Sequence, residues 1–243
     1  MNEKITLVIP VYNEAGVIEG VVRDYYNKII KKLPDSEFII AEDGSTDGTK
    51  DILKRLQKEL NLKLVSSDER KGYEKARNDA LKLAKNEIIL FSDSDGQHDP
   101  EDFWKLLEKS DYDLVVGSKI NRDDPFYRVL ISKLGNMMYG IMFNVWLPDA
   151  NCGFRMIKKR VVDGIIDDIK YLPYSGNAEI SIRAKHKGYK VTQVPVKHFK
   201  RENGSGVFSA RKMPKVILKQ VVGLLKLRFD MLTERGAKAN IQQ

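Results

Sequence analysis

Short apolar runs that alternate with helical patterns dominate the first half of the chain. Residues 5–11 form a continuous apolar run, and shorter strand-like segments follow at 38–41, 62–65, 87–91 and 113–117. Helical patterns separate them at about 15–33, 47–60 and 74–84, and a short helix begins at Asp99-Pro100. An apolar run without polar alternation is typical of a strand that is buried on both faces. The pattern therefore predicts an α/β fold, a mostly parallel sheet flanked by helices.

The second half of the chain is less regular. It suggests a helix at 129–145, strands at 154–157 and 189–196, a helix at 178–187 and a final amphipathic helix at 214–232. We divide the chain into an α/β domain at 1–210, an amphipathic and membrane-interfacial helix at 211–235, and a flexible tail at 236–243.

Charge and cysteine content restrict the partners of the chain. Its 243 residues carry a formal charge of +8, which favours anionic partners, although solubility alone explains it equally well. Cys152 is the one cysteine, which excludes an intramolecular disulfide and fits a reducing cytosol. No run is apolar for the ~18 residues that would span a bilayer, so we expect any membrane contact to be peripheral. No basic run is interleaved with aromatic residues, so nucleic acid is not an expected partner.

An acidic pair directly follows the predicted strand at 87–91. Asp93 and Asp95 are two residues apart, so in an extended segment their side chains point the same way. Carboxylate oxygens suit Mg²⁺ or Mn²⁺, ions that neutralise the charge of a departing diphosphate. Gln97 offers a further oxygen or a position for a bound water. Paired aspartates are common in surface loops, but their place at the end of a buried strand favours a metal site.

A second acidic cluster, Glu42-Asp43, ends the predicted strand at 38–41. Acidic residues at such strand ends accept hydrogen bonds from a base or a ribose in other nucleotide-binding folds. The same segment also fits a turn in which Thr46 or Asp47 caps the next helix, and both interpretations can hold, with Asp47 capping and Asp43 binding. The cations from Lys71 to Arg77 suit either a phosphate at a helix start or a solvated basic helix.

These motifs resemble, in order and spacing, those of the family-two inverting glycosyltransferases of GT-A (Rossmann-like) fold. The first segments that carry the resemblance are Val8-Ile9-Pro10-Val11-Tyr12-Asn13-Glu14, Glu42-Asp43-Gly44-Ser45-Thr46-Asp47-Gly48-Thr49 and Asp93-Ser94-Asp95. Three more resemble the dolichyl- or polyprenyl-phosphate sugar (mannose or glucose) synthases, namely residues 95–101, 149–155 and 194–205. The resemblance covers about residues 4–230.

The resemblance implies a role for each matching residue. A nucleotide sugar donor of the GDP-mannose or UDP-glucose type would be held by Pro10, Tyr12, Glu14, Glu42, Asp43, Asp93 and Ser94. Mg²⁺ or Mn²⁺ would be bound by Asp93, Asp95 and Gln97. The acceptor phosphate would be held by Lys119, Arg128 and Ser132. The catalytic residues would be Asp95, Arg128 and Arg201, with Arg201 closing over the diphosphate.

Three segments depart from the family pattern. Glu42 replaces the usual aspartate, which can alter the contacts with the base. Residues 70–79 differ from the usual Gly-Lys-Gly-x-Ala-x-Arg-x-Gly, and Gly206-Val207 replaces the usual Ser-Lys. The roles of these two segments are therefore open.

The resemblance implies transfer of a hexose with inversion to a polyprenyl (dolichyl) phosphate at the cytoplasmic membrane face. A phosphate acceptor is ionised at neutral pH and needs charge balance more than a base. A hydroxyl acceptor on a glycan would need a carboxylate base, for which Glu179 and Asp149 are candidates. The third possibility is a catalytically silent subunit that binds a nucleotide sugar.

The final predicted helix has an amphipathic pattern that is relevant to contact with a membrane. It carries an apolar face and an adjacent basic stripe of Lys215, Lys219 and Lys226. The apolar face consists of Leu218, Val221, Val222, Leu225, Phe229 and Leu232. This pattern fits a peripheral helix at a membrane surface, and it also fits a helix packed on the core or on another subunit.

Overall fold

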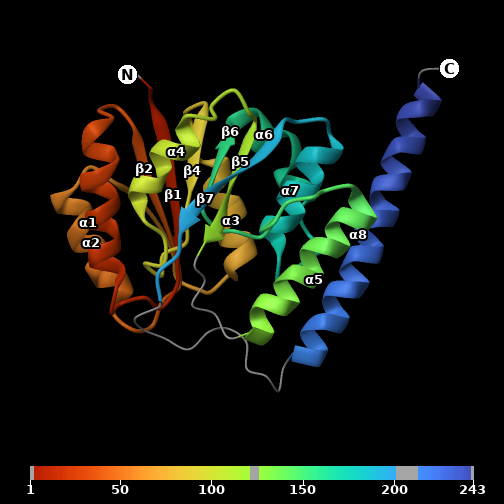
Figure 1. Cartoon of the computed structure of the whole chain (residues 1–243). Helices are drawn as coiled ribbons and strands as arrows, with labels where there is room; N and C mark the ends of the chain where they lie inside the picture. Colours follow the sequence, from red (N-terminus) through yellow and green to blue (C-terminus); the bar gives the residue numbers. More distant parts are fainter. Residues whose placement is uncertain (1–2, 121–125, 201–212, 242–243) are drawn as a thin grey trace.

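A seven-stranded sheet forms the centre of the computed structural model, which describes residues 3–120, 126–200 and 213–241 (Figure 1). The strands are β1 (Ile5–Val11), β2 (Glu37–Asp43), β3 (Lys63–Ser67), β4 (Ile88–Phe91), β5 (Leu114–Ile120), β6 (Arg155–Lys158) and β7 (Val191–Lys197). Their order is β3-β2-β1-β4-β6-β5-β7. Strand β6 is antiparallel to β4 and β5, and the other neighbours are parallel. The expected mostly parallel α/β fold is confirmed.

Helices cover both faces of this sheet. They are α1 (Ile18–Lys28), α2 (Thr49–Glu59), α3 (Tyr73–Lys82), α4 (Phe103–Leu107), α5 (Phe126–Phe143), α6 (Lys159–Ile165), α7 (Gly176–His186) and α8 (Met213–Ile241). Short 3₁₀ turns lie at Ile30–Lys32, Pro100–Asp102 and Ile166–Asp168. Helix α1 packs beside α2, α3 packs beside α6, and α6 packs beside α7. Helices α5 and α8 lie outside α7, at one side of the molecule (Figure 1).

The apolar run at the start of the chain forms β1, an interior strand of the sheet. All seven residues of β1 are buried, and β1 pairs with β2 on one side and β4 on the other. Leu7 and Ile9 are fully buried in the main hydrophobic cluster. A strand with neighbours on both edges and helices on both faces has no solvated side, which explains why its sequence does not alternate.

The turn between β2 and α2 is fixed by Asp47. Its Oδ1 accepts hydrogen bonds from the backbone N–H of Thr49 at 3.1 Å and from the Thr49 hydroxyl at 2.6 Å, at the first residue of α2. Its Oδ2 accepts from the Ala15 N–H at 3.0 Å, which ties the loop after β1 to this turn. The N-cap residue of α2 is Gly48, and Asp47, one residue earlier, bonds the Thr49 N–H at the helix start and holds the two strand-end loops together.

A second, smaller hydrophobic cluster joins α5, α7 and α8. Tyr139 of α5, Ile182 of α7 and Leu227 of α8 are buried in it. Gly223 allows a close approach here, because a Cβ at this position would lie 2.2 Å from the Tyr171 carbonyl oxygen. The amphipathic α8 is therefore packed on the domain along one of its faces.

Three features of the second half differ from the expectation. Helix α6 was not predicted, and β6 enters the sheet antiparallel. Helix α8 continues to Ile241, so it runs through most of the stretch 236–243 that was expected to be a tail. Within the described ranges, no helix combines the length and the apolar character needed to cross a membrane.

Candidate active site

The carboxyl ends of β1, β2 and β4 open into a cavity of about 720 Å³. Parallel strands end together at this edge, so the loops that follow them meet there. Eight of the predicted site residues line the cavity: Pro10, Tyr12, Glu14, Asp43, Asp93, Ser94, Asp95 and Lys119. The N-terminal ends of α3 and α7 complete the wall through Tyr73, Glu74, Gly176 and Asn177.

The acidic pair lies just beyond β4. Asp93 and Asp95 both face the cavity, and the Asp95 Oδ1 accepts a hydrogen bond from the Gln97 N–H at 3.2 Å. Gly153 lies against Asp93, because a Cβ at Gly153 would be 1.9 Å from Asp93 Oδ2. The absence of a side chain at position 153 thus makes room for the Asp93 carboxylate.

A chain of hydrogen bonds supports Asp93 from the side of α3 and α7. The Tyr73 hydroxyl donates to Asp93 Oδ1 at 2.7 Å and accepts from Asn177 Nδ2 at 3.3 Å. The Asn177 Oδ1 in turn accepts from Arg77, whose side chain is fully buried, at 3.1 Å. Sequence analysis did not find Tyr73 or Asn177, since nothing local in the sequence links them to Asp93.

The predicted nucleoside side of the cavity is shaped by residues 70–72. The Asp43 carboxylate accepts hydrogen bonds from the backbone N–H of Lys71 at 2.7 Å and of Gly72 at 2.9 Å. The Arg70 guanidinium lies over the Tyr12 ring, 3.9 Å from its centroid. The segment whose role was open therefore forms part of the cavity wall and covers one face of Tyr12.

Glu42 lies beneath the cavity and does not line it. Its side chain is buried, and its carboxylate accepts hydrogen bonds from the Ser45 N–H and the Ser66 hydroxyl. These bonds shape the turn that presents Asp43. A direct contact between Glu42 and a donor stays a prediction.

Lys119 brings a positive charge into the cavity. Its Nζ lies 3.5 Å from Asp149 Oδ2, and both side chains are largely buried. The Asp149 side chain holds Lys119 at the wall and does not itself line the cavity. A lysine at this place can contact an anionic group without a large rearrangement.

Four other predicted residues lie away from the described wall or outside the described structure. The Gln97 Nε2 donates to the Phe199 carbonyl at 2.9 Å, which directs its amide toward the segment after β7. Ser132 lies in α5 and does not line the cavity. Arg128 is in the first turn of α5, but its side chain is outside the described part, and Arg201 lies entirely outside it.

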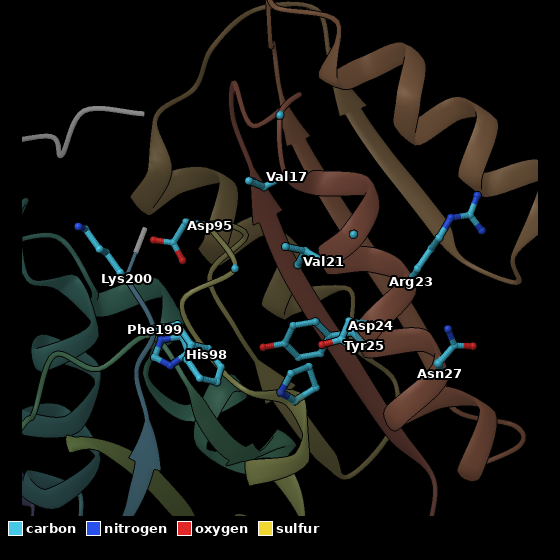
Figure 2. Close-up of a pocket in the computed structure, with 14 residues that line it drawn as sticks. Val17, Val21, Arg23, Asp24, Tyr25, Asn27, Asp95, His98, Phe199 and Lys200 are labelled. Carbon is cyan, nitrogen blue, oxygen red and sulfur yellow. The ribbon is translucent and has the colours of Figure 1, made fainter. Parts of the chain in front are cut away.

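A second cavity, of about 550 Å³, lies on the other side of Asp95. Figure 2 shows Asp95, His98 and Phe199 on one side of it and the α1 residues Val21 and Tyr25 on the other. Burial lowers the pKa of His98 well below its usual value, and the nearby Lys119 and His198 act in the same direction. Asp95 thus lines both cavities.

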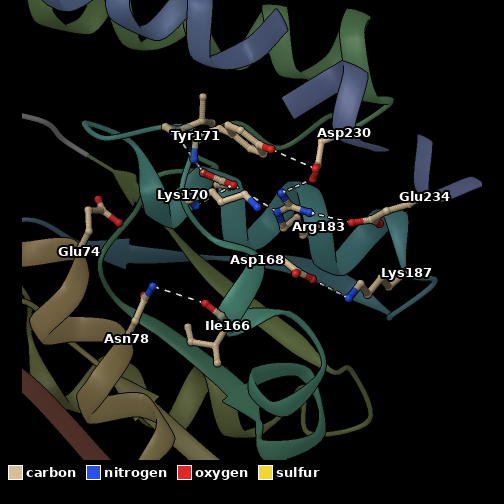
Figure 3. A network of polar contacts seen from close by, with 12 residues as sticks. Glu74, Asn78, Ile166, Asp168, Lys170, Tyr171, Arg183, Lys187, Asp230 and Glu234 are labelled. Carbon is tan, nitrogen blue, oxygen red and sulfur yellow. Dashed lines mark hydrogen bonds and ion pairs between the residues drawn. The ribbon is translucent and has the colours of Figure 1, made fainter. Parts of the chain in front are cut away.

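Glu179, a candidate base from the sequence, has a structural role instead. Its side chain is fully buried, and it accepts hydrogen bonds from the N–H groups of Lys170, Tyr171 and Leu172. It also pairs with Arg183 at 3.2 Å, and Arg183 reaches Asp230 of α8 at 2.8 Å and Glu234 at 3.4 Å (Figure 3). A carboxylate with these partners and no access to the cavity cannot take a proton from an acceptor, so that prediction was wrong.

Glu74 is a carboxylate in the cavity wall that sequence analysis missed. Its carboxylate pairs with Arg77 at 2.6 Å and packs against Gly176. Burial raises the pKa of Glu74 above its usual value, although Arg77 acts in the opposite direction. Perturbed carboxylates in cavities are candidate proton acceptors.

The donor set of the cavity fits a divalent cation. Asp93 and Asp95 offer hard oxygen ligands at its wall, and Mg²⁺ is commonly bound by one or two carboxylates together with substrate phosphates. Among residues 3–120, 126–200 and 213–241, no three His, Cys, Asp or Glu side chains form a metal site by themselves. The pair would therefore need oxygen ligands from a substrate or water.

A polar cavity with paired carboxylates beyond the strand ends is the arrangement of α/β proteins that bind ligands at this edge. The chain belongs to glycosyl transferase family 2, whose model matches residues 6–166. The expected enzyme class, a glycosyltransferase, is confirmed at the level of this family.

Two curated relatives can be aligned in sequence with most of this chain. Glycosyltransferase AglD of Haloferax volcanii is 29% identical over 79% of this chain and 32% of that protein. The undecaprenyl-phosphate 4-deoxy-4-formamido-L-arabinose transferase of Pseudomonas fluorescens is 26% identical over 94% of this chain and 64% of that protein. The chain thus spans about a third of the first relative and just under two thirds of the second.

Solved structures support the fold. Glucosyl-3-phosphoglycerate synthase from Mycobacterium tuberculosis, crystallised with Mn²⁺, UDP and phosphoglyceric acid, aligns with a TM-score of 0.71. The alignment covers 93% of this chain and 78% of that one at 18% identity. At this identity the likeness shows the GT-A type of fold and nothing about the substrate.

Proposed function

We propose that this chain is a metal-dependent inverting glycosyltransferase that moves a hexose from a nucleotide diphosphate sugar to a polyprenyl (dolichyl) phosphate. The observation that carries the proposal is that Asp93, Asp95 and Lys119 face one cavity at the strand ends. The name of the Pseudomonas relative, an undecaprenyl-phosphate sugar transferase, supports a lipid phosphate acceptor. The acceptor would reach the enzyme from the cytoplasmic face of a membrane, with the enzyme bound peripherally.

The donor would occupy the cavity between Tyr12 and Asp43 on one side and the acidic pair on the other. A Mg²⁺ or Mn²⁺ ion held by Asp93 and Asp95, with Gln97 as a further ligand or support, would neutralise the diphosphate oxygens. The Asp93 carboxylate is held by Tyr73 before any ligand binds, in the space that Gly153 leaves, which limits the reorganisation that binding requires. Preorganised charge of this kind lowers the barrier for departure of a nucleoside diphosphate.

Binding of the acceptor phosphate would depend on positively charged side chains. A phosphate monoester is ionised at neutral pH, so it attacks without a base and needs its charge balanced. Lys119 lies in the cavity wall and can supply this balance. Arg128, Ser132 and Arg201 are proposed as further acceptor or diphosphate contacts on the basis of the family resemblance.

The test is transfer of a radiolabelled sugar from a panel of GDP- and UDP-sugars to a polyprenyl phosphate, read as label in the organic phase. We expect transfer with one donor, dependence on Mg²⁺ or Mn²⁺, and loss with EDTA. The variant Asp95→Asn should reduce transfer by at least 100-fold, while Asp111→Asn, at an exposed site far from the cavity, should leave it unchanged. Absence of transfer with every donor and metal would refute the proposal.

Glu74 favours a second candidate function, transfer to a hydroxyl group of a glycan. A hydroxyl acceptor needs a base, and Glu74 lies in the cavity wall with a raised pKa. In that case Glu74→Gln should reduce kcat by at least 100-fold, and the labelled product should stay in the aqueous phase. With a phosphate acceptor, the same variant should change KM more than kcat.

A further inference from the structure

Arg155 is the first residue of β6, and its side chain is fully buried. Its backbone pairs with Phe91, the last residue of β4, two residues before Asp93. Among the described residues, its hydrogen-bond acceptors are backbone carbonyl oxygens, and no carboxylate forms an ion pair with it. Burial of a cation without a counter-ion is costly, so the stability of the core alone does not explain an arginine at this position.

The guanidinium group of Arg155 binds the loop that precedes β6. Its Nε donates to the Cys152 carbonyl oxygen at 3.0 Å. Its Nη2 donates to the same oxygen and to the Ala150 carbonyl oxygen, the latter at 3.4 Å. The Cys152 carbonyl belongs to the peptide unit that joins Cys152 to Gly153. These bonds therefore orient the backbone of Gly153, whose lack of a side chain makes room for the Asp93 carboxylate.

The same guanidinium group binds the first turn of α7. Its Nη1 donates to the Asn177 carbonyl oxygen at 2.8 Å. The Asn177 side chain donates to the Tyr73 hydroxyl, which in turn donates to Asp93. Arg155 therefore binds two segments that flank Asp93, the loop before β6 and the start of α7.

Two neutral side chains connect the same segments. The Ser181 hydroxyl lies 3.1 Å from the Ala150 carbonyl oxygen and 3.2 Å from the Asn177 carbonyl oxygen, as a donor to both. The Asn151 Oδ1 accepts a hydrogen bond from the Ala178 N–H at 3.2 Å. The loop before β6 and the start of α7 are thus joined at several points, to which Arg155 contributes a charged connection.

The electrostatic environment of Arg155 also connects it with Asp93. Burial lowers the pKa of Arg155 to about 10 and the buried Arg77 acts in the same direction, whereas Asp93 acts in the opposite direction. The guanidinium group is therefore charged at neutral pH. It lies at the N-terminal end of α7, where the helix dipole disfavours a cation. The carbonyl oxygens and the charge of Asp93 offset this cost.

We infer that Arg155 is a positioning residue for the acidic pair, which holds the loop before β6 and the start of α7 at a fixed separation around Asp93. The planar guanidinium group donates in several fixed directions, so one side chain binds both segments. A lysine at this position keeps the charge but lacks the fork of donors. The inference rests on the proposed function for one point, that Asp93 binds a divalent cation.

Mn²⁺ binding by Arg155→Lys tests the inference. We expect the Mn²⁺ affinity, measured by electron paramagnetic resonance with a nucleoside diphosphate, to fall at least tenfold. Arg183→Lys is the matched control, because Arg183 is also a buried arginine, and its carboxylate partners lie outside the cavity. It should lower the free energy of unfolding and keep the Mn²⁺ affinity of the wild type. Loss of affinity in both variants, or in neither, would overturn the inference.

The reactivity of Cys152 gives a measurement that needs no metal. Its thiol is fully buried in the loop that Arg155 binds. Weaker hydrogen bonding of this loop should favour its local opening, so Ellman's reagent should react with native Arg155→Lys at least tenfold faster than with the wild type. Arg183→Lys should react as slowly as the wild type. An unchanged rate in Arg155→Lys would contradict the role of the guanidinium group in holding the loop.

A milder variant serves if Arg155→Lys does not fold. Ser181→Ala removes the hydroxyl that connects the same two segments, and it should lower the Mn²⁺ affinity about threefold, the effect of one hydrogen bond. Its control is Ser36→Ala, because the Ser36 Oγ accepts a buried hydrogen bond from the Ile5 N–H at 3.1 Å, at the amino end of β1. The control should bind Mn²⁺ like the wild type. Equal affinity of Ser181→Ala and Ser36→Ala would then overturn the inference.

A double-mutant cycle tests the connection through α7. Part of the effect of Arg155 passes through Asn177 and Tyr73, so the combined loss in Arg155→Lys/Tyr73→Phe should be smaller than the product of the two single losses. Independent losses would contradict this connection.

Failure of the inference is separable from failure of the proposed function. Wild type that binds Mn²⁺ and transfers sugar, together with Arg155→Lys of equal Mn²⁺ affinity, would refute the inference alone. Weaker Mn²⁺ binding by Arg155→Lys, without sugar transfer by the wild type, would support the inference and refute the proposed function. Wild type that binds no Mn²⁺ with any nucleoside diphosphate would refute both.

Discussion

Tyr73 and Asp93 are joined by a hydrogen bond of 2.7 Å between the Tyr73 hydroxyl and Asp93 Oδ1. The bond connects the first residue of α3 with the acidic loop after β4, and Asn177 of α7 donates to the same hydroxyl. Asp93 is therefore oriented by two helices that are remote in sequence from its own strand.

The first prediction concerns this bond. Tyr73→Phe removes the donor to Asp93 and should weaken Mn²⁺ binding by about 10- to 100-fold, because groups that orient a metal ligand have effects of this size. Mn²⁺ binding in the presence of nucleoside diphosphate, followed by electron paramagnetic resonance, measures the change. Tyr189→Phe is the control, since it removes a phenol that donates to the Arg160 carbonyl far from the cavity. Equal Mn²⁺ affinity of Tyr73→Phe and the wild type would show that the bond does not support a metal ligand.

The second prediction concerns the space that Gly153 leaves for Asp93. Gly153→Ala places a Cβ 1.9 Å from Asp93 Oδ2, so the carboxylate has to move. Mn²⁺ binding should fall at least tenfold and sugar transfer about 100-fold. Gly20→Ala is the matched change, because Gly20 lies in α1 with nothing within 4 Å of the added Cβ. The free energy of unfolding of the Gly20→Ala variant should stay the same or rise by up to about 1 kcal/mol. Undiminished metal binding by Gly153→Ala would place the metal away from Asp93.

The third prediction concerns the buried cation of α7. Arg183→Met keeps the volume of the side chain but leaves the Glu179 carboxylate buried without its counter-ion. The free energy of unfolding should fall by about 3–5 kcal/mol, as when one partner of a buried pair is removed. Urea unfolding followed by circular dichroism measures it. Lys82→Met breaks the exposed pair with Asp167 and should cost less than ~1 kcal/mol. A small effect at both positions would contradict the structural role of the Arg183 network.

The fourth prediction concerns the single thiol. Burial, together with the charge of Asp149, raises the pKa of Cys152 to about 12, whereas an unfolded thiol titrates near ~8.5. A group with a raised pKa in the folded state stabilises it fully below the unfolded pKa, and this stability is lost as pH rises. Above pH ~8.5 the wild type should therefore lose up to about 1.4 kcal/mol per pH unit relative to Cys152→Ala.

Urea unfolding of the wild type and Cys152→Ala at a series of pH values measures this difference. Reaction with Ellman's reagent gives an independent check, because the fully buried Cys152 should react only after unfolding. Rapid reaction in the native state, or parallel pH profiles of the two proteins, would contradict the prediction.

The sequence predicts those parts of the fold that depend on local patterns. Each of these patterns is a continuous segment of sequence, so the end of its strand can be recognised from its own residues. The examples are the apolar run of β1 and the loops that begin at Tyr12, Asp43 and Asp93. Their meeting in one cavity follows from the parallel order of the strands. The antiparallel direction of β6 could not be predicted in this way, because it depends on pairing with β4 and β5 and not on residues 155–158 themselves.

The site contacts that escaped prediction are made between distant residues. Nothing near Glu179 in the sequence shows that the backbone of residues 170–172 encloses its carboxylate. The place of Arg70 over Tyr12 likewise depends on how the segment after β3 meets the loop after β1. Such contacts follow from the assembled fold, so residue type and spacing alone do not reveal them.

Arg183 also fixes the orientation of α8 relative to the rest of the domain. It ties α8 to α7 through Asp230 and Glu234, and the hydroxyl of Tyr171 adds a further bond of 3.0 Å to Asp230. These bonds hold α8 in a fixed orientation relative to the domain, unlike a helix that is joined to its domain only by a flexible linker. When α8 contacts a surface, the orientation of the helix on that surface therefore fixes the orientation of the α/β domain and the direction in which the strand-end cavity opens.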